Sequence, residues 1–405
     1  MKKVIFIALV ALIFATWGAT IYYAMKAEGK TADAGTSTTA ESIVESTYAT
    51  IETIDKETTA ETTKETSAVQ IESTPGPATT VTEKTTEQAT LEQLREFRVN
   101  ETGVIYILMF HGFISDDMGA SFGDREYTMT FSQFGNTLQM LYDMDYRPIS
   151  MDEFLNGHID VPLGKIPVVL TFDDGRSGQF NLIEQNGELV ANPDSAVGIW
   201  LEFNESHPDF SLKGTFYVNL GLGTFEGKGT LQQRLRYIID LGFEIGNHTY
   251  THEALRLMTR KDDVIYQMGK NQEVMDTLVP GYKMTSLALP YGEDVKPDEL
   301  KEYVVKGAYN GTQYHHLGVL DCKWKPSYSP FSVNYDSRMI YRVRADGLDP
   351  VACDMSDWMF TKLTTTRGQF ISDGDPDIVT VPVSLESDVN RDAAGGREII
   401  TYILE

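Results

Sequence analysis

The chain of 405 residues is poor in cysteine and in positive charge. Its two cysteines, Cys322 and Cys353, form no CxxC pair, which excludes a thiolate zinc site. They could form one disulfide in an oxidising compartment, or remain separate buried thiols. Lysine and arginine number 34 against 59 aspartate and glutamate residues, which gives a formal net charge of −25. This charge repels phosphate groups and therefore argues against nucleic acid as a partner.

Charged residues are absent from a long apolar run near the N-terminus, residues 4–25, which follows Lys2 and Lys3. The run is long enough to span a bilayer as a helix, and the two lysines favour an inside N-terminus. A cleaved secretory signal is the alternative. Residues 1–30 are therefore predicted to be a signal anchor or a signal peptide. Both readings place the remaining chain on the extracellular face of the cell membrane, or secreted into the cell wall.

Large apolar side chains are scarce in residues 31–95, which are rich in threonine, glutamate, serine and alanine. Such a segment cannot bury enough surface to offset its chain entropy, so we expect a disordered, extended linker. The folded domain is predicted to cover residues 96–405. Within it, residues 360–405 alternate like β-strands with glycine and aspartate turns, and we expect a β-rich extension that forms an edge hairpin.

The folded part alternates strand-like and helix-like segments. A capping box of Thr130 and Gln133 predicts the start of one helix. Further helices are expected at 230–242, 260–278 and 297–307, and strands at 103–112, 166–172, 214–220, 243–246 and 285–290. This alternation predicts an α/β fold, a closed or nearly closed parallel (β/α) barrel. The long connection at 177–213 could lie over the barrel mouth.

Chemically distinctive residues follow four of the predicted strands. These residues are His111, the pair Asp173 and Asp174, the pair His248 and His252, and Pro290 with Tyr291. The carboxyl ends of barrel strands meet at one rim, where active sites of such barrels lie, so we expect these groups to lie together. Two adjacent carboxylates at the end of a buried strand also need a compensating cation.

The spacing of His248 and His252 places two imidazoles on one face of a helical turn. Alone, this HxxxH pattern is more often structural than metal-binding. Combined with a strand that ends in two aspartates, it predicts a divalent metal site with two histidines and one carboxylate. One aspartate would bind the ion, and the other would be free to act as a general base.

The segments TFDDG at 171–175, GTFYVN at 214–219 and HTYTH at 248–252 resemble, in this order, the polysaccharide deacetylases related to rhizobial chitooligosaccharide deacetylase. The resemblance implies a distorted (β/α) barrel that removes acetyl groups from sugars in polymers. It also implies that Asp173 is the catalytic base. The expected ligands of the metal are Asp174, His248 and His252, with zinc as the usual ion and cobalt or nickel as alternatives.

The PYG segment at 290–292 resembles the end of the family's R-x-P-Y motif. The resemblance implies that Pro290 contacts substrate and that the backbone N–H of Tyr291 binds the oxyanion. The chain departs from the motif at Ala288, which stands where the family has an arginine that orients the base. Arg176 is a candidate for that role and for substrate contact, with an exposed loop arginine as the alternative.

The family's late L-x-H motif, which supplies the general acid, is missing from this chain. His111 is a candidate replacement, because a histidine with a near-neutral pKa at the end of the first strand could protonate the leaving amine. A structural histidine is the alternative.

These features lead to the hypothesis of an extracellular, metal-dependent deacetylase that acts on a polysaccharide of N-acetylglucosamine, such as peptidoglycan. An esterase that removes O-acetyl groups from xylan-type polysaccharides is an alternative. A carbohydrate-binding protein of weak activity is a third reading, favoured by Ala288 and the missing late histidine. The expected partners are the polysaccharide and, through the N-terminal segment, the membrane.

Overall fold

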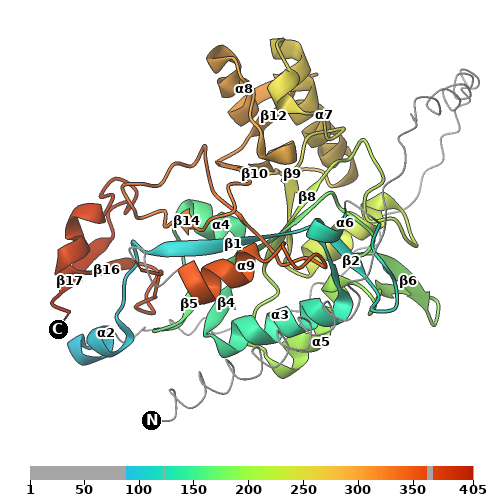
Figure 1. Cartoon of the computed structure of the whole chain (residues 1–405). Helices are drawn as coiled ribbons and strands as arrows, with labels where there is room; N and C mark the ends of the chain where they lie inside the picture. Colours follow the sequence, from blue (N-terminus) through green and yellow to red (C-terminus); the bar gives the residue numbers. More distant parts are fainter. Residues whose placement is uncertain (1–87, 122–123, 363–367, 405) are drawn as a thin grey trace, which may run out of the picture. The chain divides into compact units, whose positions relative to one another are not determined.

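The structure is a computed structural model that describes residues 88–121, 124–362 and 368–404, all within one compact unit of residues 81–405 (Figure 1). The predicted signal segment 1–30 and most of the predicted linker 31–95 lie outside the described residues. Helix α2 (Leu91–Phe97) begins within the range given to the linker, at the capping residue Thr90. In the described part of the chain, no helix is both long enough and apolar enough to span a bilayer.

A curled, nine-stranded sheet forms the centre of the domain, and its main path runs β13-β10-β9-β8-β5-β1-β14. Its strands are β1 (Val104–Phe110), β4 (Tyr146–Pro148), β5 (Ile166–Asp173), β8 (Gly214–Val218), β9 (Glu244–Asn247), β10 (Ser286–Ala288), β13 (Gly318–Leu320), β14 (Ser327–Tyr328) and β15 (Val343–Arg344). All pairings are parallel except that of β14 with β1. The predicted α/β fold is confirmed, with a curled half-barrel sheet at its centre.

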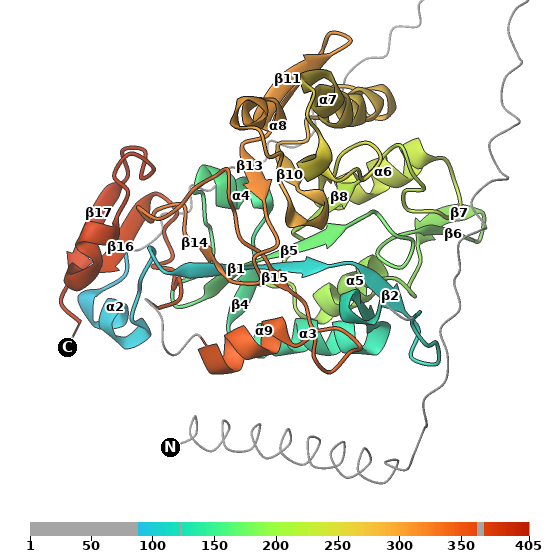
Figure 2. The same cartoon turned by 45° about the horizontal axis from the view of Figure 1, so that its top comes forward.

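A short segment links the two ends of this curled sheet. Ile340 forms a parallel bridge with Leu320 of β13, and β15 pairs with β1 a few residues later. In Figure 2 β15 lies beside β1, close to the middle of the domain. The segment that crosses from β13 to β1 therefore passes the carboxyl ends of the central strands, and it carries Arg342 between its two pairing points.

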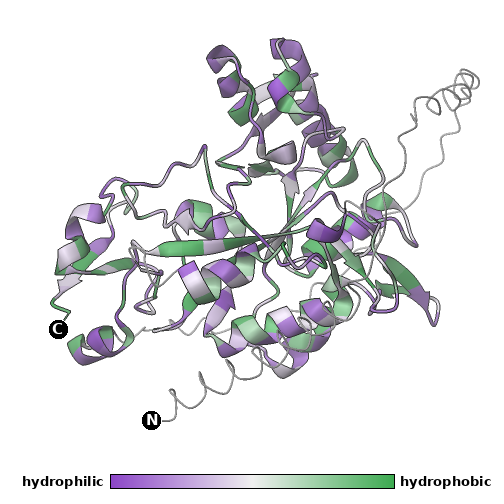
Figure 3. Ribbon diagram, in the orientation of Figure 1, coloured by the Kyte–Doolittle hydropathy of each residue, from purple (hydrophilic) through white to green (hydrophobic). Residues whose placement is uncertain are grey.

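Helices cover the sheet: α3 (Phe131–Asp143), α4 (Met151–Asn156), α5 (Ala196–Ser206), α6 (Leu231–Asp240), α7 (Lys261–Leu278), α8 (Lys301–Val305) and α9 (Asp354–Ser356). The capping box predicted at Thr130 and Gln133 is present at the start of α3. Phe134 on α3 and Trp200 on α5 are fully buried, within one apolar cluster that includes residues of β1, β5 and β8. Figure 3 shows the apolar colouring of β1 and β5 that this core requires.

Short elements complete the domain. They are the strand pairs β2 (Gly112–Ile114) with β3 (Thr128–Thr130) and β11 (Lys306–Tyr309) with β12 (Thr312–His315), and the 3₁₀ turns η1 (Arg125–Tyr127), η2 (Leu255–Leu257), η3 (Pro290–Gly292), η4 (Asp298–Leu300) and η7 (Val383–Asp388). A π-helical turn, η5 (Asp357–Lys362), follows α9. The helix expected at 297–307 is η4 followed by α8, and residues from Lys306 onward are already strand β11.

Two peripheral segments differ from the sequence expectations, the first of them only in its α5 half. The connection 177–213 contains a hairpin of β6 (Leu182–Gln185) and β7 (Glu188–Ala191) and then helix α5. Because Trp200 of α5 packs in the core, this half of the connection covers the sheet rather than the barrel mouth. Near the C-terminus, β16 (Ile378–Pro382) and β17 (Glu398–Tyr402) pair in parallel in a sheet of their own, so they form no edge hairpin.

Candidate metal centre and active site

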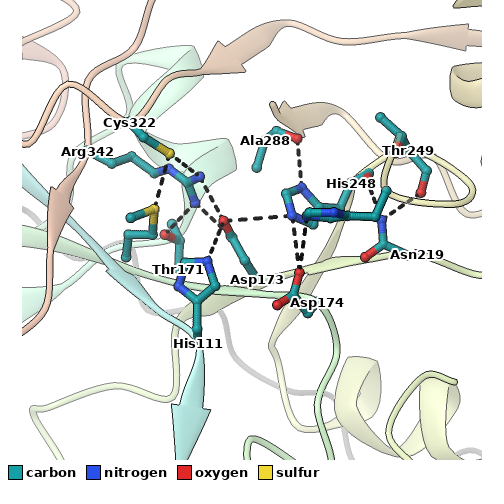
Figure 4. Close-up of polar contacts among 12 residues, drawn as sticks. His111, Thr171, Asp173, Asp174, Asn219, His248, Thr249, Ala288, Cys322 and Arg342 are labelled. Atoms are coloured by element: carbon teal, nitrogen blue, oxygen red, sulfur yellow. Dashed lines mark hydrogen bonds and ion pairs between the residues drawn. The ribbon is translucent and has the colours of Figure 1, made fainter. Parts of the chain in front are cut away.

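The two aspartates predicted from TFDDG leave the end of β5 in different directions. Asp173 is the last residue of the strand, and its side chain is 2% exposed. Asp174 follows with a φ of 78°, in the left-handed region that costs a non-glycine residue free energy. The turn places Asp174 toward the two histidines, while Asp173 lies between His248 and Arg342 (Figure 4). The adjacent carboxylates thus face different partners.

Asp174, His248 and His252 form a three-residue cluster whose ligand atoms all lie within 4.8 Å of one another. The Oδ1 atom of Asp174 lies 3.5 Å from Nε2 of His248 and 3.5 Å from Nε2 of His252. Two ligand atoms of a tetrahedral zinc ion, each about 2.0–2.1 Å from the metal, are about 3.4 Å apart. The three residues therefore fit a divalent metal and leave room for further ligands.

The tautomer of His248 supports the same conclusion. Its Nδ1 lies 2.8 Å from the carbonyl oxygen of Ala288, and a carbonyl can only accept a hydrogen bond. The Nδ1 atom therefore carries the proton, and the lone pair of Nε2 points toward Asp174. A backbone carbonyl on the second ring nitrogen is the usual support of a metal-binding histidine.

The helical turn expected for His248 and His252 is absent. The histidines lie in a loop after β9, in which Thr249 and His252 both have positive φ angles. Asn219 donates hydrogen bonds from its side-chain nitrogen to the carbonyl oxygens of His248 and Thr249, and Asn247 accepts one from the Thr249 N–H. These amide side chains hold the loop so that the imidazole centroids are 4.9 Å apart.

Arg342 holds the predicted base, Asp173. Its Nη1 lies 2.7 Å from Oδ1 and its Nη2 lies 2.8 Å from Oδ2, and the arginine side chain is fully buried. Burial alone would raise the pKa of Asp173, but Arg342, His248 and His111 together hold it below its ordinary value. The carboxylate is therefore ionised and fixed in one orientation.

The prediction that Arg176 orients Asp173 is wrong. Its guanidinium instead pairs with Oδ2 of Asp174, with Nε at 3.0 Å and Nη2 at 2.9 Å. Arg176 follows the turn after β5, so its side chain reaches the outer oxygen of Asp174 rather than the buried Asp173. This arginine therefore supports a predicted metal ligand, and its contact with substrate stays a prediction.

His111 lies at the same rim, directly after β1, and its Nε2 is 3.8 Å from Oδ2 of Asp173. Burial lowers the pKa of His111 to about 4, against the attraction of Asp173 and Asp174. This pKa lies below the near-neutral value expected from the sequence, although 17% of the side chain is exposed. Its Nδ1 is buried and has no hydrogen-bond partner among the residues that the structure describes. The position fits a proton-transfer role, which stays a prediction.

Tyr291 lies beside the metal cluster. It has a φ of 60°, its side chain is 65% exposed, and its ring centroid is 4.8 Å from that of His252. Pro290 precedes it in the buried start of turn η3. The PYG segment is thus at the rim, as the sequence predicts, whereas oxyanion binding by the Tyr291 N–H and substrate contact by Pro290 stay predictions.

Two residues of the site were missed by the sequence reasoning. Besides Arg342, Gln179 donates from its side-chain nitrogen to the carbonyl oxygens of His111 and Asp173, which ties two strand ends together. One available signal was the alternation of Ile340, Arg342 and Arg344 with other residues in a late strand-like segment, together with the arginine role left empty by Ala288. No sequence signal marks Gln179.

The cysteines are separate thiols rather than a disulfide. The Sγ atom of Cys322 lies 3.5 Å from Nη2 of Arg342 and 3.4 Å from Sδ of Met109, and burial raises its pKa. Cys322 therefore packs as a neutral group beside the arginine that holds Asp173.

Residues 206–310 match the family model described as Polysaccharide deacetylase. The matched range includes the HTYTH loop and the PYG turn, and it begins after Asp173 and Asp174. Over these residues, the match confirms the resemblance to polysaccharide deacetylases that the sequence analysis predicts. No curated protein sequence matches the chain.

Solved structures of deacetylases resemble the chain. The deacetylase PplD of Streptococcus pyogenes, in complex with acetate, is 17% identical with a TM-score of 0.44, over 60% of this chain and 92% of that chain. A polysaccharide deacetylase from Bacillus cereus is 18% identical with a TM-score of 0.45, over 62% and 68%. A de-N-acetylase from Aggregatibacter actinomycetemcomitans is 14% identical with a TM-score of 0.40, over 60% and 95%.

Proposed function

We propose that the chain is an extracellular, metal-dependent deacetylase that removes N-acetyl groups from a polysaccharide containing N-acetylglucosamine. The family match supports hydrolytic deacetylation, and one observation supports catalysis by this chain. Next to three residues that fit a divalent ion stands a second carboxylate, Asp173, which is held by Arg342 and ionised. A protein that only bound carbohydrate would have no use for a fixed base beside a metal site.

In the proposed reaction, the metal ion and the side chains have separate roles. A divalent ion held by Asp174, His248 and His252 would act as a Lewis acid toward the acetyl carbonyl group and the attacking water. Asp173 accepts the proton of that water, because it is ionised and its carboxylate cannot rotate away from the site. The Tyr291 N–H is the proposed donor to the oxyanion that forms.

Proton delivery to the leaving amine is assigned to His111. Because burial lowers its pKa to about 4, the imidazole is neutral near pH 7 and must accept a proton before it can donate one. Asp173 lies 3.8 Å away and holds the proton taken from water. We therefore propose that the proton passes from Asp173 through His111 to the nitrogen as the C–N bond breaks.

The extracellular location is part of the proposal and rests on the sequence. The uncharged apolar run 4–25 after Lys2 and Lys3 is typical of a signal anchor or a signal peptide. We place the domain on the outer face of the membrane or in the cell wall, where an acetylated glycan is within its reach.

The test is an assay of released acetate with the purified chain, metal-depleted and then supplied with zinc, cobalt or nickel. The substrates are N-acetylglucosamine oligomers, peptidoglycan and acetylated xylan. Metal-dependent acetate from the glucosamine substrates supports the proposal. Acetate from xylan alone would replace it with an O-acetyl esterase, and one bound metal without acetate from any substrate would favour a binding protein.

A further inference from the structure

Trp324 is a large apolar residue that lies exposed at the rim of the site. It belongs to the loop that leaves the carboxyl end of β13, and its side chain is 45% exposed. Its φ of 53° is in the left-handed region, which is uncommon for a bulky residue and requires support from the surroundings. Because nearly half of this side chain is exposed, packing alone does not explain a tryptophan in a strained loop beside the proposed active site.

Several contacts fix the position of this tryptophan. The Nε1–H of Trp358 donates to its carbonyl oxygen at 2.6 Å. The guanidinium of Arg344 lies over the Trp324 ring, 5.3 Å from its centroid. Arg344 is itself held by Glu126 at 2.6 Å and by Asp354 at 2.8 Å. The guanidinium lies on one face of the indole and the side chain is 45% exposed, so a ligand would contact the exposed remainder of the ring.

A chain of ring contacts leads from Trp324 to the proposed proton donor. Arg344 also lies over the ring of Tyr127, 5.2 Å from its centroid, and that ring is 5.0 Å from the ring of His111. Along the backbone, Cys322 stands two residues before Trp324 and contacts Arg342. Through these contacts the indole is connected to His111, and through the backbone at Cys322 it is connected to the residue that holds Asp173.

We propose that Trp324 is a stacking platform for a sugar ring of the polysaccharide, at a subsite beyond the sugar that loses its acetyl group, on the His111 side. Pyranose rings present a face of C–H groups, and the negative face of an indole attracts such groups while it removes apolar surface from water. An oligosaccharide that reaches from the metal centre to Trp324 gains this contact, whereas a short one does not. The platform rests on the proposed function for its ligand class, a polymer of N-acetylglucosamine.

The experiment compares binding of the N-acetylglucosamine hexamer and dimer to the full-length, metal-depleted chain by calorimetry. The variants are Trp324→Ala, the conservative Trp324→Phe, and the control Phe97→Ala. Phe97 is a similarly exposed aromatic residue, 40% exposed, in α2 at the other end of β1. Circular dichroism of each variant checks that it is folded.

For Trp324→Ala we expect about a tenfold loss of hexamer affinity relative to dimer affinity, the effect of one lost ring contact. Trp324→Phe should recover most of the loss, and Phe97→Ala should behave as wild type. The platform would be overturned if Trp324→Ala left the ratio of hexamer to dimer affinity unchanged, including by weakening both equally. It would also be overturned if the wild-type chain did not bind the hexamer. Binding needs no turnover, so a wild-type chain that binds the hexamer but releases no acetate would refute the proposed function and leave the platform in place.

Discussion

Arg342 and Asp173 form a bidentate ion pair between a segment that links the ends of the curled sheet and the end of its central strand β5. Both side chains are buried, so the pair has little competition from water and either partner alone would be costly. Two parallel N–H···O bonds also fix the plane of the carboxylate, which a lysine could not do. Arg342 thus orients the base, the role of the arginine that Ala288 replaces in the motif.

Arg342→Lys is therefore expected to lower kcat by on the order of 10–10² while the protein stays folded and metal-loaded. Loss of the guanidinium weakens one of the interactions that lower the pKa of Asp173, so that pKa rises. The acidic limb of the pH–rate profile should then move to higher pH, because Asp173 must be ionised to act. Arg342→Ala should also destabilise the fold, by about 3–5 kcal/mol.

The control for this prediction is Arg147→Lys, which alters a buried arginine that pairs with Asp209, outside the site. This variant should keep the position of the acidic limb. An unshifted limb in Arg342→Lys would mean that Arg342 does not control the ionisation of the base.

The adjacent aspartates should have separable functions. Asp173→Asn is expected to abolish turnover and to retain wild-type metal content, because Asp173 is not one of the clustered ligand atoms. Asp174→Asn and His252→Ala should both lose metal, since each removes one of three donors. Metal analysis by mass spectrometry after gel filtration measures the stoichiometry. Full metal content in Asp174→Asn, or substantial activity in Asp173→Asn, would contradict the assignment.

Much of this site could be predicted from local sequence patterns. The strand that ends in Asp173 and the capping box at Thr130 are short-range features, and the structure contains both. The metal cluster could be predicted because parallel strands bring their carboxyl ends together, whatever segments connect them. The helical turn expected at HxxxH was wrong because side-chain amides hold that loop, and one of them, Asn219, lies after β8, far from the loop in sequence.

Arg342 shows what local patterns cannot reveal. It lies 169 residues after Asp173 in the chain, and its role depends on how the curled sheet is completed. A buried arginine in a short segment reads as an ordinary surface residue until the partner carboxylate is known. The same holds for the pKa of His111, which depends on how fully neighbouring segments shield the ring from water.

His111→Gln is expected to lower kcat by on the order of 10²–10⁴, with metal content unchanged, if the side chain carries the proton to the leaving amine. In the wild-type chain, the profile of kcat/KM should have no limb from His111 between pH 6 and 8, because burial lowers the pKa of this residue to about 4. A histidine limb near pH 6.5 that disappears in His111→Gln would show that the ring is exposed to water in the free enzyme. Wild-type kcat in the variant would remove His111 from the mechanism.

Glu101 provides a test of the fold outside the site. Its carboxyl group is buried and accepts hydrogen bonds from the backbone N–H groups of Thr380 at 2.9 Å and Asp373 at 3.3 Å. Burial and the nearby Asp373 raise the pKa of Glu101 well above its ordinary value of 4.5. The folded state therefore binds this proton more tightly than the unfolded state, so the stabilisation is complete below pH 4.5 and is lost as pH rises through the folded pKa.

Glu101→Gln mimics the protonated carboxyl group and should flatten this dependence. We expect the difference in unfolding free energy between pH 5 and pH 8 to shrink by at least about 1.4 kcal/mol, the equivalent of one pKa unit. Urea unfolding at the two pH values, with Asp377→Asn as an exposed control from the nearby loop, measures the change. If Glu101→Gln keeps the wild-type pH dependence, another buried carboxyl group causes it, and Asp373, whose pKa burial also raises, is the next to be substituted.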